Sequence, residues 1–500
     1  MIKEFKHYTK NINESCDVCV IGSGAGGAVV ARELAEKGHS VILLEEGGNY
    51  TVDDWTGKPL AEFSKMYRNG ATTGTLGRNF ISLTMGKCIG GTTTINSATC
   101  FRPPESTYKK WLLELGLDQL TPETLEDCFC RVEKEINVTE LSWEVLGNFA
   151  KVLKTGADKL GLNCKPLKHN VKDCKGCGTC QFGCPEGAKQ SMDITYIPKA
   201  IEYGAKVYAN CRADKLIKNE NEVEGVSCSL INPETGKADY SMKIRAKIVV
   251  VACGTMITPS FLKRNGLKNK NIGRHLQIHP AAKAVAFMDQ KVEGWKGVSQ
   301  GAYIDDFEGE GIMLEGAFTT PGLLLAAVPY IGKKHKEIAT SYPHVAPFGI
   351  MVHDTSKGRV LKSSPKNINA VYNISKHDVE KLKRGIAYTA RILFEAGANV
   401  VFTGISKMPV LNSVDDVNKL FALKVKANQI ETFAFHPVGT CRMSATSDSG
   451  AVNQWGEAFE MKNLYVADGS VVPTSLGVNP QLTIMCLATR IAQGISQKLG

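Results

Sequence analysis

Hydrophobic residues near the start of the chain fall in blocks that predict a strand, a helix and a second strand. Residues 17–22 form a short, mostly apolar run typical of a buried strand, and residues 28–37 are good helix formers that end before Gly38, a natural helix cap. Residues 41–44 are the next apolar run. A strand, a glycine-rich turn, a helix and a strand make a βαβ unit, whose right-handed crossover places two parallel strands in one sheet.

The rest of the chain divides into a helical stretch, one further buried strand and a strand-rich region. Residues 248–251 are a continuous β-branched run of the kind buried on both faces of a parallel sheet, so we expect them to rejoin the first sheet. Between residues 277 and 432, strands and isolated helices alternate with Gly and Pro turns, which predicts an antiparallel sheet in a second domain. Residues 110–165 are expected to be helical, with one buried face made of Trp111, Leu112, Leu115, Leu125, Phe129 and Val132.

Composition and charge narrow the class of protein. The 500 residues exceed what one hydrophobic core normally organises, and 43% apolar with 22% charged residues is the balance of a soluble globular protein. The net charge of +10 is spread without a basic run, which argues against nucleic-acid binding. No apolar run approaches the roughly 18 residues that a membrane helix needs, so no membrane span is expected.

The cysteine content bears on the cellular compartment. The first ten residues are polar and lack the apolar segment of a secretion signal. Sixteen cysteines without such a signal indicate a reducing compartment, where thiolates serve as metal ligands more often than as disulfides. A cytoplasmic location is therefore expected.

A Gly-x-Gly-x-x-Gly pattern joins the first predicted strand to the first helix. Gly22 can make the tight turn, Gly24 can let the backbone approach a pyrophosphate, and Gly27 can let the helix pack on the strand. Glu45, at the end of the second strand, can accept hydrogen bonds from ribose hydroxyls, although it could equally be a solvated strand end. The pattern predicts a dinucleotide site, but it does not separate FAD from NAD.

Three further segments decide between the two dinucleotides. They are residues 86–102, which include Gly90, Gly91 and Asn96, residues 254–266, and residues 467–470, which include Asp468 and Gly469. With these segments in this order, the sequence resembles the glucose-methanol-choline (GMC) oxidoreductases over nearly its whole length. In that family the first segment wraps the flavin, the second returns the chain to the FAD sheet, and the third places an Asp near the ribityl chain.

The resemblance implies FAD bound without a covalent link. Some members attach the flavin through a His just before the position of Asn96, and Ile95 stands there in this chain, which excludes that attachment. The cofactor-binding residues expected from the glycine pattern and from the family segments are Gly22, Gly24, Gly27, Glu45, Gly90, Gly91, Asn96, Asp468, Gly469, Pro480 and Gln481.

Two polar residues near the C-terminus are candidates for the chemistry. Oxidation of an alcohol by hydride transfer needs a base for the hydroxyl proton and a donor that holds the developing alkoxide. A lone His before a Pro is more often structural, but the resemblance assigns both His436 and Asn479 to the active site. His275 and His279, on a loop that leads into the second domain, are expected to be structural.

A cysteine run in the middle of the chain predicts a metal site. Cys174, Cys177, Cys180 and Cys184 have the spacing with which bacterial ferredoxins bind an Fe–S cluster, and the glycines between them allow tight turns. Because there is no second run for a second cluster, we expect one [4Fe-4S] cluster with four local ligands, or a [3Fe-4S] cluster with one cysteine to spare. A four-cysteine zinc site is the structural alternative, and a disulfide cluster is less favoured.

Within the resemblance, FAD-dependent glucose and fructose dehydrogenases carry a related cysteine cluster that takes electrons from the reduced flavin. The sequence therefore predicts a FAD-dependent dehydrogenase that oxidises a small-molecule alcohol to an aldehyde or ketone. Its electrons would leave through the cluster to an external one-electron acceptor, which can be a protein. Two alternatives stay open: a GMC-type oxidase that uses oxygen and has a structural cluster, and a non-catalytic flavin and Fe–S electron carrier.

The predicted fold is α/β, and α+β overall, with a Rossmann-like FAD-binding domain and a second, antiparallel-sheet substrate domain. Residues 1–109, 206–276 and 433–500 are expected to form the FAD-binding domain, and the last of these parts carries the catalytic residues. Residues 110–205 are expected to form a helical cap with the cysteine insert, and residues 277–432 the substrate domain.

Overall fold

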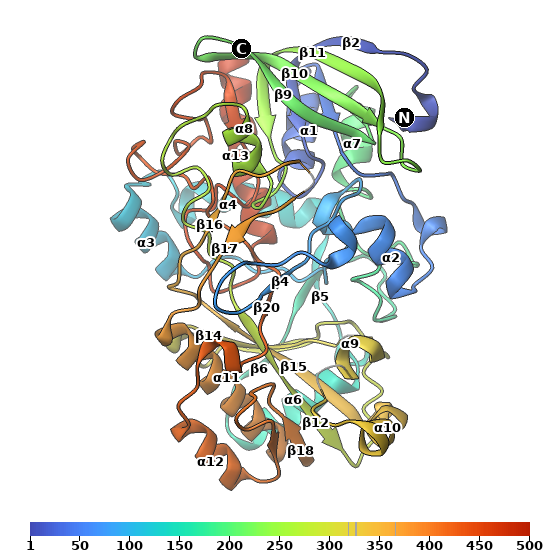
Figure 1. Ribbon diagram of the computed structural model, residues 1–500, viewed down its shortest axis with the longest axis vertical. Coiled ribbons are helices and arrows are strands. Elements are labelled where there is room, and N and C mark those ends of the chain that lie inside the picture. Colours follow the sequence, from blue (N-terminus) through green and yellow to red (C-terminus); the bar gives the residue numbers. More distant parts are fainter. Residues whose placement is uncertain (319, 326–327, 366) are drawn as a thin grey trace.

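The described residues build two large β-sheets, one toward each end of the long axis of the molecule (Figure 1). The computed structural model describes residues 1–318, 320–325, 328–365 and 367–500. Both termini lie at the end that holds the first sheet (Figure 1). The mixed α/β fold expected from the sequence is confirmed.

The first sheet has the strand order β1-β8-β3-β2-β11-β10-β9, with β21 beside β11. Strands β3, β2, β11 and β21 run parallel, as the βαβ pattern predicts. The strand predicted at residues 17–22 is the buried end of a longer strand, and the run at residues 248–251 ends β11 between β2 and β21. The strand bounds are β1 (Ile2–Lys3), β2 (Ile12–Ile21), β3 (Val41–Leu44), β8 (Lys206–Tyr208), β9 (Cys211–Asn219), β10 (Glu222–Ile231), β11 (Ala238–Val251) and β21 (Leu464–Val466).

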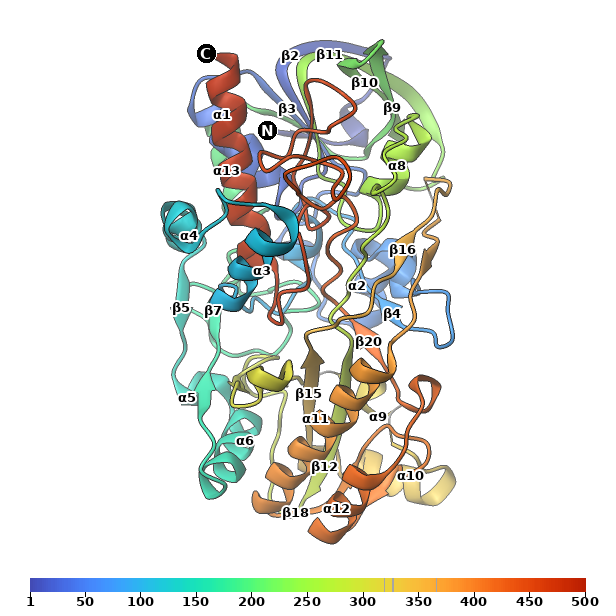
Figure 2. The same cartoon turned by 90° about the vertical axis from the view of Figure 1, so that its left-hand side faces the viewer.

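Helix α1 (Gly27–Glu36) packs against β2 and β3 of this sheet, α13 (Gln481–Leu499) packs beside α1, and α4 (Pro122–Glu135) packs on α13 (Figure 2). The buried face predicted for the helical stretch is confirmed on α3 (Glu105–Leu115) and α4, with one exception. Leu112 is 47% exposed, because it follows the buried Trp111 directly and so points about 100° away around the helix.

The second sheet is antiparallel through its main path, as predicted, with the order β19-β18-β12-β15-β14-β13-β6. Helices α11 (Lys376–Glu395) and α6 (Asn148–Lys159) pack against it. The strand bounds are β4 (Ser82–Leu83), β6 (Cys164–Pro166), β12 (Ala281–Met288), β13 (Ala302–Ile304), β14 (Ile312–Gly316), β15 (Val345–Val352), β18 (Ala398–Phe402), β19 (Val410–Leu411) and β20 (Phe433–Ala434), where β20 joins β12 to β4.

The remaining helices and strand pairs are short. They are α2 (Pro59–Met66), α5 (Trp143–Leu146), α7 (Tyr196–Glu202), α8 (Thr258–Arg264), α9 (Pro321–Leu325), α10 (Gly332–Thr340), α12 (Val414–Ala422), and the pairs β5 (Val138–Glu140) with β7 (Lys168–Asn170) and β16 (Arg359–Val360) with β17 (Ala370–Val371). Within the described ranges, none of the helices combines the length and the apolar content needed to cross a bilayer.

Candidate active site

The carboxyl ends of β2, β3, β11 and β21 meet at one edge of the first sheet because the four strands are parallel. Four positions singled out in the sequence lie just past these strand ends. They are Gly22, Glu45, Gly254 and Asp468. Ligands of open parallel sheets bind outside such strand ends, so the predicted cofactor residues come together where a dinucleotide would lie.

The three glycines of the Gly-x-Gly-x-x-Gly pattern, which we call the glycine turn, serve different purposes. Gly22 has a φ of +103°, and a Cβ there would lie 2.2 Å from Ala252 O. A Cβ on Gly27 would lie 1.9 Å from Gly22 O, so both positions exclude a side chain. At Gly24 a Cβ would meet only Gly91 Cα, at 3.9 Å. The side of Gly24 is therefore open, as backbone approach to a pyrophosphate requires.

Glu45 is buried beneath the glycine turn rather than solvated at a strand end. Its Oε2 accepts hydrogen bonds from Ser23 N at 3.1 Å and Ser23 Oγ at 2.7 Å, and its Oε1 accepts one from Gly47 N at 2.8 Å. Burial raises the pKa of this carboxyl. The carboxyl is thus fixed beside the turn that would hold the adenosine end of the dinucleotide.

The Gly90–Asn96 segment contacts the glycine turn at Ser23 and Gly24. Gly90 N donates to Ser23 Oγ at 3.1 Å, and a Cβ on Gly91 would lie 2.8 Å from Gly24 Cα. At the other end of the segment, Asn96 Nδ2 donates to Gln481 Oε1 at the start of α13. The segment therefore spans from the glycine turn to the N-terminus of α13.

Asp468 and Gly469, which follow β21, lie at the same edge of the first sheet. The buried Asp468 accepts hydrogen bonds from Gly254 N at 2.8 Å and Ser470 N at 2.7 Å, and burial raises its pKa. A Cβ on Gly469 would lie 2.6 Å from Thr255 Oγ1, so a side chain is excluded there. At Gly254 a Cβ would meet no atom within 4 Å.

These residues fit a bound dinucleotide. Gly24 and Gly254 leave space just past the strand ends, and α1 begins there with a helix N-terminus, the kind of site that binds phosphate. Pro480 is the N-cap of α13, which places a second helix start beside Asn96. Ile95, in place of an attaching His, is 5% exposed.

His436 presents a neutral imidazole. The ring is half-buried, its Nδ1 lies 3.2 Å from Met351 Sδ, and no described residue hydrogen-bonds to Nε2. Burial, with a contribution from the nearby His279, lowers the pKa of His436 to about 3. The ring is therefore unprotonated at neutral pH and able to accept a proton.

Asn479 is paired with an acidic residue that the sequence analysis missed. Asn479 Nδ2 donates to Glu315 Oε1 at 3.4 Å, and its Oδ1 is buried with no hydrogen-bond partner among the described residues. Glu315 is 5% exposed, and burial raises its pKa to about 8, so the carboxyl is mainly protonated at neutral pH. A single acidic residue inside the apolar strand β14 was the sequence signal for it.

The second sheet brings these candidates together. Met313 pairs with Met351, and Glu315 pairs with Gly349, so the contacts of His436 and Asn479 lie two residues apart on adjacent strands. Residues two apart on a strand share a face and lie about 7 Å from each other. His436 and Asn479 therefore approach the same face of the β14–β15 pair.

The cysteine run forms a loop of tight turns, but its sulfurs do not form a ligand set. Cys177 is exposed, with its Sγ 3.1 Å from Thr179 Oγ1, while Cys180 and Cys184 are buried and Cys174 is half-buried. Over the parts of the chain that the structure describes, no three or more His, Cys, Asp or Glu side chains are arranged to hold a metal. The predicted Fe–S ligation, and the zinc alternative, are thus not supported by this arrangement, in which Cys177 is exposed while Cys180 and Cys184 are buried.

Lys189 connects the cysteine loop to the Gly90–Asn96 segment, which we call the flavin segment because the family resemblance places it against the flavin. The sequence carried no signal for this role of Lys189. The side chain is 2% exposed. Its Nζ donates to Thr94 O at 2.6 Å, to Asn96 O at 3.0 Å and to Cys180 O at 2.6 Å. One buried ammonium group therefore holds both segments together.

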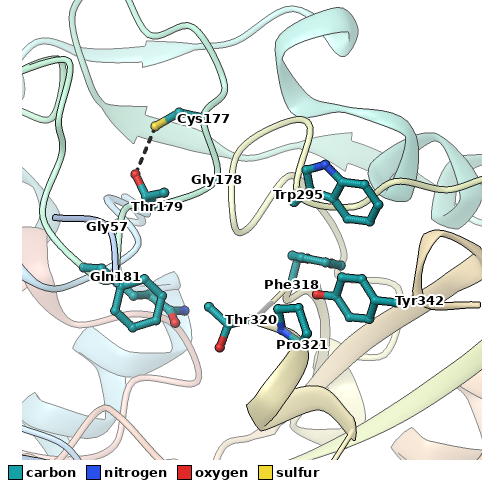
Figure 3. A pocket seen from close by; sticks show the side chains of 11 residues that line it. Gly57, Cys177, Gly178, Thr179, Gln181, Trp295, Phe318, Thr320, Pro321 and Tyr342 are labelled. Carbon is teal, nitrogen blue, oxygen red and sulfur yellow. Dashed lines mark hydrogen bonds between the residues drawn. The ribbon is translucent and has the colours of Figure 1, made fainter. Parts of the chain in front are cut away.

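A cavity of about 310 Å³ opens beside the cysteine loop (Figure 3). Its walls include four aromatic residues, Phe182, Trp295, Phe318 and Tyr342. The rings of Trp295 and Tyr342 are stacked with centroids 5.5 Å apart. Gln181, also in the wall, donates from Nε2 to Ser97 Oγ at 3.2 Å, next to Asn96. The cavity thus adjoins the flavin segment.

Comparison with known proteins assigns the family. Two sequence profiles, both described as GMC oxidoreductase, match residues 63–281 and 354–488. An uncharacterised GMC-type oxidoreductase of Mycobacterium tuberculosis is 33% identical over 97% of this chain and 76% of its own length. The long-chain-alcohol oxidase FAO1 of Arabidopsis thaliana is 31% identical over 96% of this chain and 67% of its own length. The chain therefore belongs to the GMC oxidoreductases.

Solved structures agree on the fold. Pyridoxine 4-oxidase from Mesorbium loti matches with a TM-score of 0.71 at 18% identity, over 96% of this chain and 99% of the other. A formate oxidase variant of Aspergillus oryzae RIB40 matches with a TM-score of 0.75 at 16% identity, over 98% of this chain and 99% of the other. With the family established, FAD is the cofactor supported for the glycine-lined edge of the first sheet.

Proposed function

We propose that the chain oxidises an alcohol to an aldehyde or ketone with non-covalently bound FAD. The observation that carries the proposal is the pairing of a neutral His436 with Asn479 on one face of the β14–β15 pair, beside the segment that runs from the glycine turn to α13. When bound, FAD supplies the hydride acceptor. Ile95 in place of a histidine supports attachment without a covalent bond.

The residues divide the work of deprotonating and holding the alcohol. His436 Nε2 accepts the hydroxyl proton, because the ring is neutral and this nitrogen has no hydrogen-bond partner among the described residues. Asn479 donates one amide hydrogen to Glu315 and keeps the other for the alcohol oxygen, where negative charge develops. The protonated Glu315 adds no negative charge that would oppose this step.

An alcohol with a long apolar chain is the substrate class that the site supports best. The wall of the cavity beside the flavin segment includes Phe182, Trp295 and Phe318. Aromatic walls bind a hydrocarbon chain by removing apolar surface from water. Relatives of this chain in Arabidopsis thaliana are named long-chain-alcohol oxidases.

The route of the electrons separates two candidate functions. The cysteine spacing predicts a dehydrogenase with an Fe–S exit. The relatives named oxidases, together with the exposure of Cys177 and the lack of a ligand set among the described residues, favour an oxidase that uses oxygen. Turnover with a redox dye under argon, compared with turnover in air, distinguishes the two. About three or four irons per chain after anaerobic purification would support the presence of a cluster, and an iron content near zero would rule it out.

An anaerobic series of alcohols tests the proposed reaction. Ethanol, 1-butanol, 1-octanol and 1-dodecanol are added to the FAD-loaded protein, and the flavin absorbance is followed. We expect bleaching by 1-octanol and 1-dodecanol and little by ethanol, because only the longer chains fill the aromatic cavity. A flavin that stays oxidised with every alcohol, sterols and polyols included, would contradict the reaction class and favour a non-catalytic electron carrier.

A further inference from the structure

The loop that joins the two domains contacts both chain segments that carry the candidate catalytic residues. His279 is fully buried on this loop. Its Nδ1 lies 2.9 Å from the backbone oxygen of His436, and Leu476 N donates to its Nε2 at 2.8 Å. Asn479 follows Leu476 by three residues. One imidazole therefore bridges the His436 segment and the Asn479 segment.

The two contacts fix the protonation state of the ring. Because Leu476 N–H is a donor, Nε2 must act as an acceptor and carries no proton. The proton is then on Nδ1, which donates to the carbonyl oxygen of His436. Only the neutral imidazole with this tautomer satisfies both segments at once.

The surrounding contacts hold His279 in an unfavourable backbone conformation. Its φ is +50°, in the left-handed region that costs a non-glycine residue energy. His279 N donates to the buried Asp354 Oδ1 at 3.3 Å, and Gln277 pairs through its backbone with Val438 at 3.2 and 2.8 Å. Gln277 Oε1 also accepts a hydrogen bond from Ser475 N at 2.8 Å. The loop is therefore attached on both sides of the ring.

We propose that His279 is a positioning residue that fixes His436 relative to Asn479. The proposal rests on the proposed function of those two residues. The ring of His279 lies edge-on to the ring of His436, with centroids 5.9 Å apart. By this assignment His279 takes no proton from the alcohol, and it acts by holding the backbone and the ring of His436 in place. Misplacement of a catalytic group by about 1 Å can reduce a rate by about 10²-fold, so two 2.8–2.9 Å contacts suffice for a measurable effect.

Two conservative variants separate the contacts. In His279→Asn the short side chain can place an amide NH₂ near the Nδ1 position, which keeps the bond to His436 O and loses the acceptor for Leu476. In His279→Gln the longer side chain can place its oxygen near the Nε2 position, which keeps the Leu476 bond and loses the other. His279→Ala keeps neither. His275→Gln is the matched control, because His275 lies on the same loop, also with a positive φ of 61°, and contacts Asn271 instead.

The test is stopped-flow reduction of the FAD-loaded variants by 1-dodecanol under anaerobic conditions, in light and heavy water. We expect the limiting reduction rate to fall on the order of 10²-fold in His279→Ala and less in the Asn and Gln variants, with the apparent Kd for the alcohol unchanged. The solvent isotope effect should grow in the variants, because transfer of the hydroxyl proton becomes slower. A purely structural role would not change this isotope effect. His275→Gln should behave as wild type.

Each contrary result has a distinct meaning. If all His279 variants reduce the flavin at the wild-type rate while His436→Ala is slow, the positioning role is wrong and the proton acceptor stands. If the His279 and His275 variants slow equally, or if only the Kd changes, the loop contributes stability alone and the proposal is overturned. If His436→Ala is as fast as wild type, the proposed function itself fails. Should His279→Ala not fold, the Asn and Gln variants decide.

Discussion

Burial drives His436 and Glu315 toward neutrality from opposite directions. The pKa of the histidine falls to about 3 and that of the carboxyl rises to about 8, because burial disfavours the charged form of each. Both therefore enter the reaction uncharged at neutral pH. A neutral ring can accept a proton, and a protonated carboxyl leaves Asn479 free of a competing negative charge.

This arrangement predicts that the rate of flavin reduction falls at alkaline pH because Glu315 ionises. As pH rises through about 8, the carboxyl ionises and places negative charge beside Asn479, where the alkoxide develops, so reduction by alcohol should slow. Glu315→Gln keeps an acceptor for Asn479 but cannot ionise. Its stopped-flow rate should stay level from pH 7 to pH 9. An alkaline fall that persists unchanged in Glu315→Gln would assign the titration to another group.

The glycine turn between β2 and α1 predicts a contrast between two alanine variants. Gly27→Ala would drive a Cβ to within 1.9 Å of Gly22 O and should destabilise the fold by about 1–3 kcal/mol, as overpacking does. Gly24→Ala meets only Gly91 Cα, at 3.9 Å, so the FAD-free protein should keep its melting temperature and lose FAD affinity. Calorimetry of the FAD-free protein and FAD titration measure the two effects. Equal FAD affinity in Gly24→Ala and wild type would contradict the assigned pyrophosphate approach.

The link between the cysteine loop and the flavin segment predicts that Lys189 is structural and essential for FAD retention. Lys189→Met removes three hydrogen bonds and leaves the buried carbonyls of Thr94, Asn96 and Cys180 without that donor, so the melting temperature and the bound FAD should both fall. Lys175→Met is the control, because Lys175 lies on the same loop but is 75% exposed and forms a salt bridge with Glu186. The control should stay within about 0.5 kcal/mol of wild type. A Lys189→Met protein with normal FAD content would show that the link is dispensable.

Local patterns predicted the elements better than they predicted the site. The strand at residues 41–44 and the helix that follows Gly24 could be predicted because an apolar run and a glycine turn are local features. The contact between Asn479 and Glu315 could not, because it joins the segment before α13 to β14, which lies far away in the sequence. The cysteine spacing was equally local, and it says nothing of the packing that leaves Cys177 exposed.

At the scale of the whole molecule, the buried His279 makes stability depend on pH. Burial lowers its pKa to about 4, below the roughly 6.5 of an unfolded chain. Between these values the unfolded protein binds a proton that the folded protein does not, so this residue costs stability as pH falls from 6.5 toward 4. Urea unfolding of wild type and His279→Gln should therefore differ in pH dependence, with the variant gaining roughly 2–3 kcal/mol relative to wild type between pH 7 and pH 4.5. Parallel curves for the two proteins would mean that the folded protein protonates this ring.

The two sheets divide the proposed reaction between them. The strand ends of the first sheet provide the dinucleotide edge, and the β14–β15 pair of the second sheet provides the surface on which His436 and Asn479 converge. Residues of the cysteine loop line the cavity (Figure 3). Gln181 and Lys189 join this region to the flavin segment. Neither sheet alone presents both the hydride acceptor and the proton acceptor, so the proposed oxidation is a property of the assembled chain.

The most direct test of His436 as the proton acceptor is the rate at which an alcohol bleaches the flavin in His436→Ala under anaerobic conditions. His275→Gln is measured in parallel. Removal of a general base predicts a loss on the order of 10²–10⁴-fold with FAD still bound, while the control reduces at the wild-type rate. Wild-type reduction by His436→Ala, with full FAD content, would contradict the proton acceptor on which the proposed function depends.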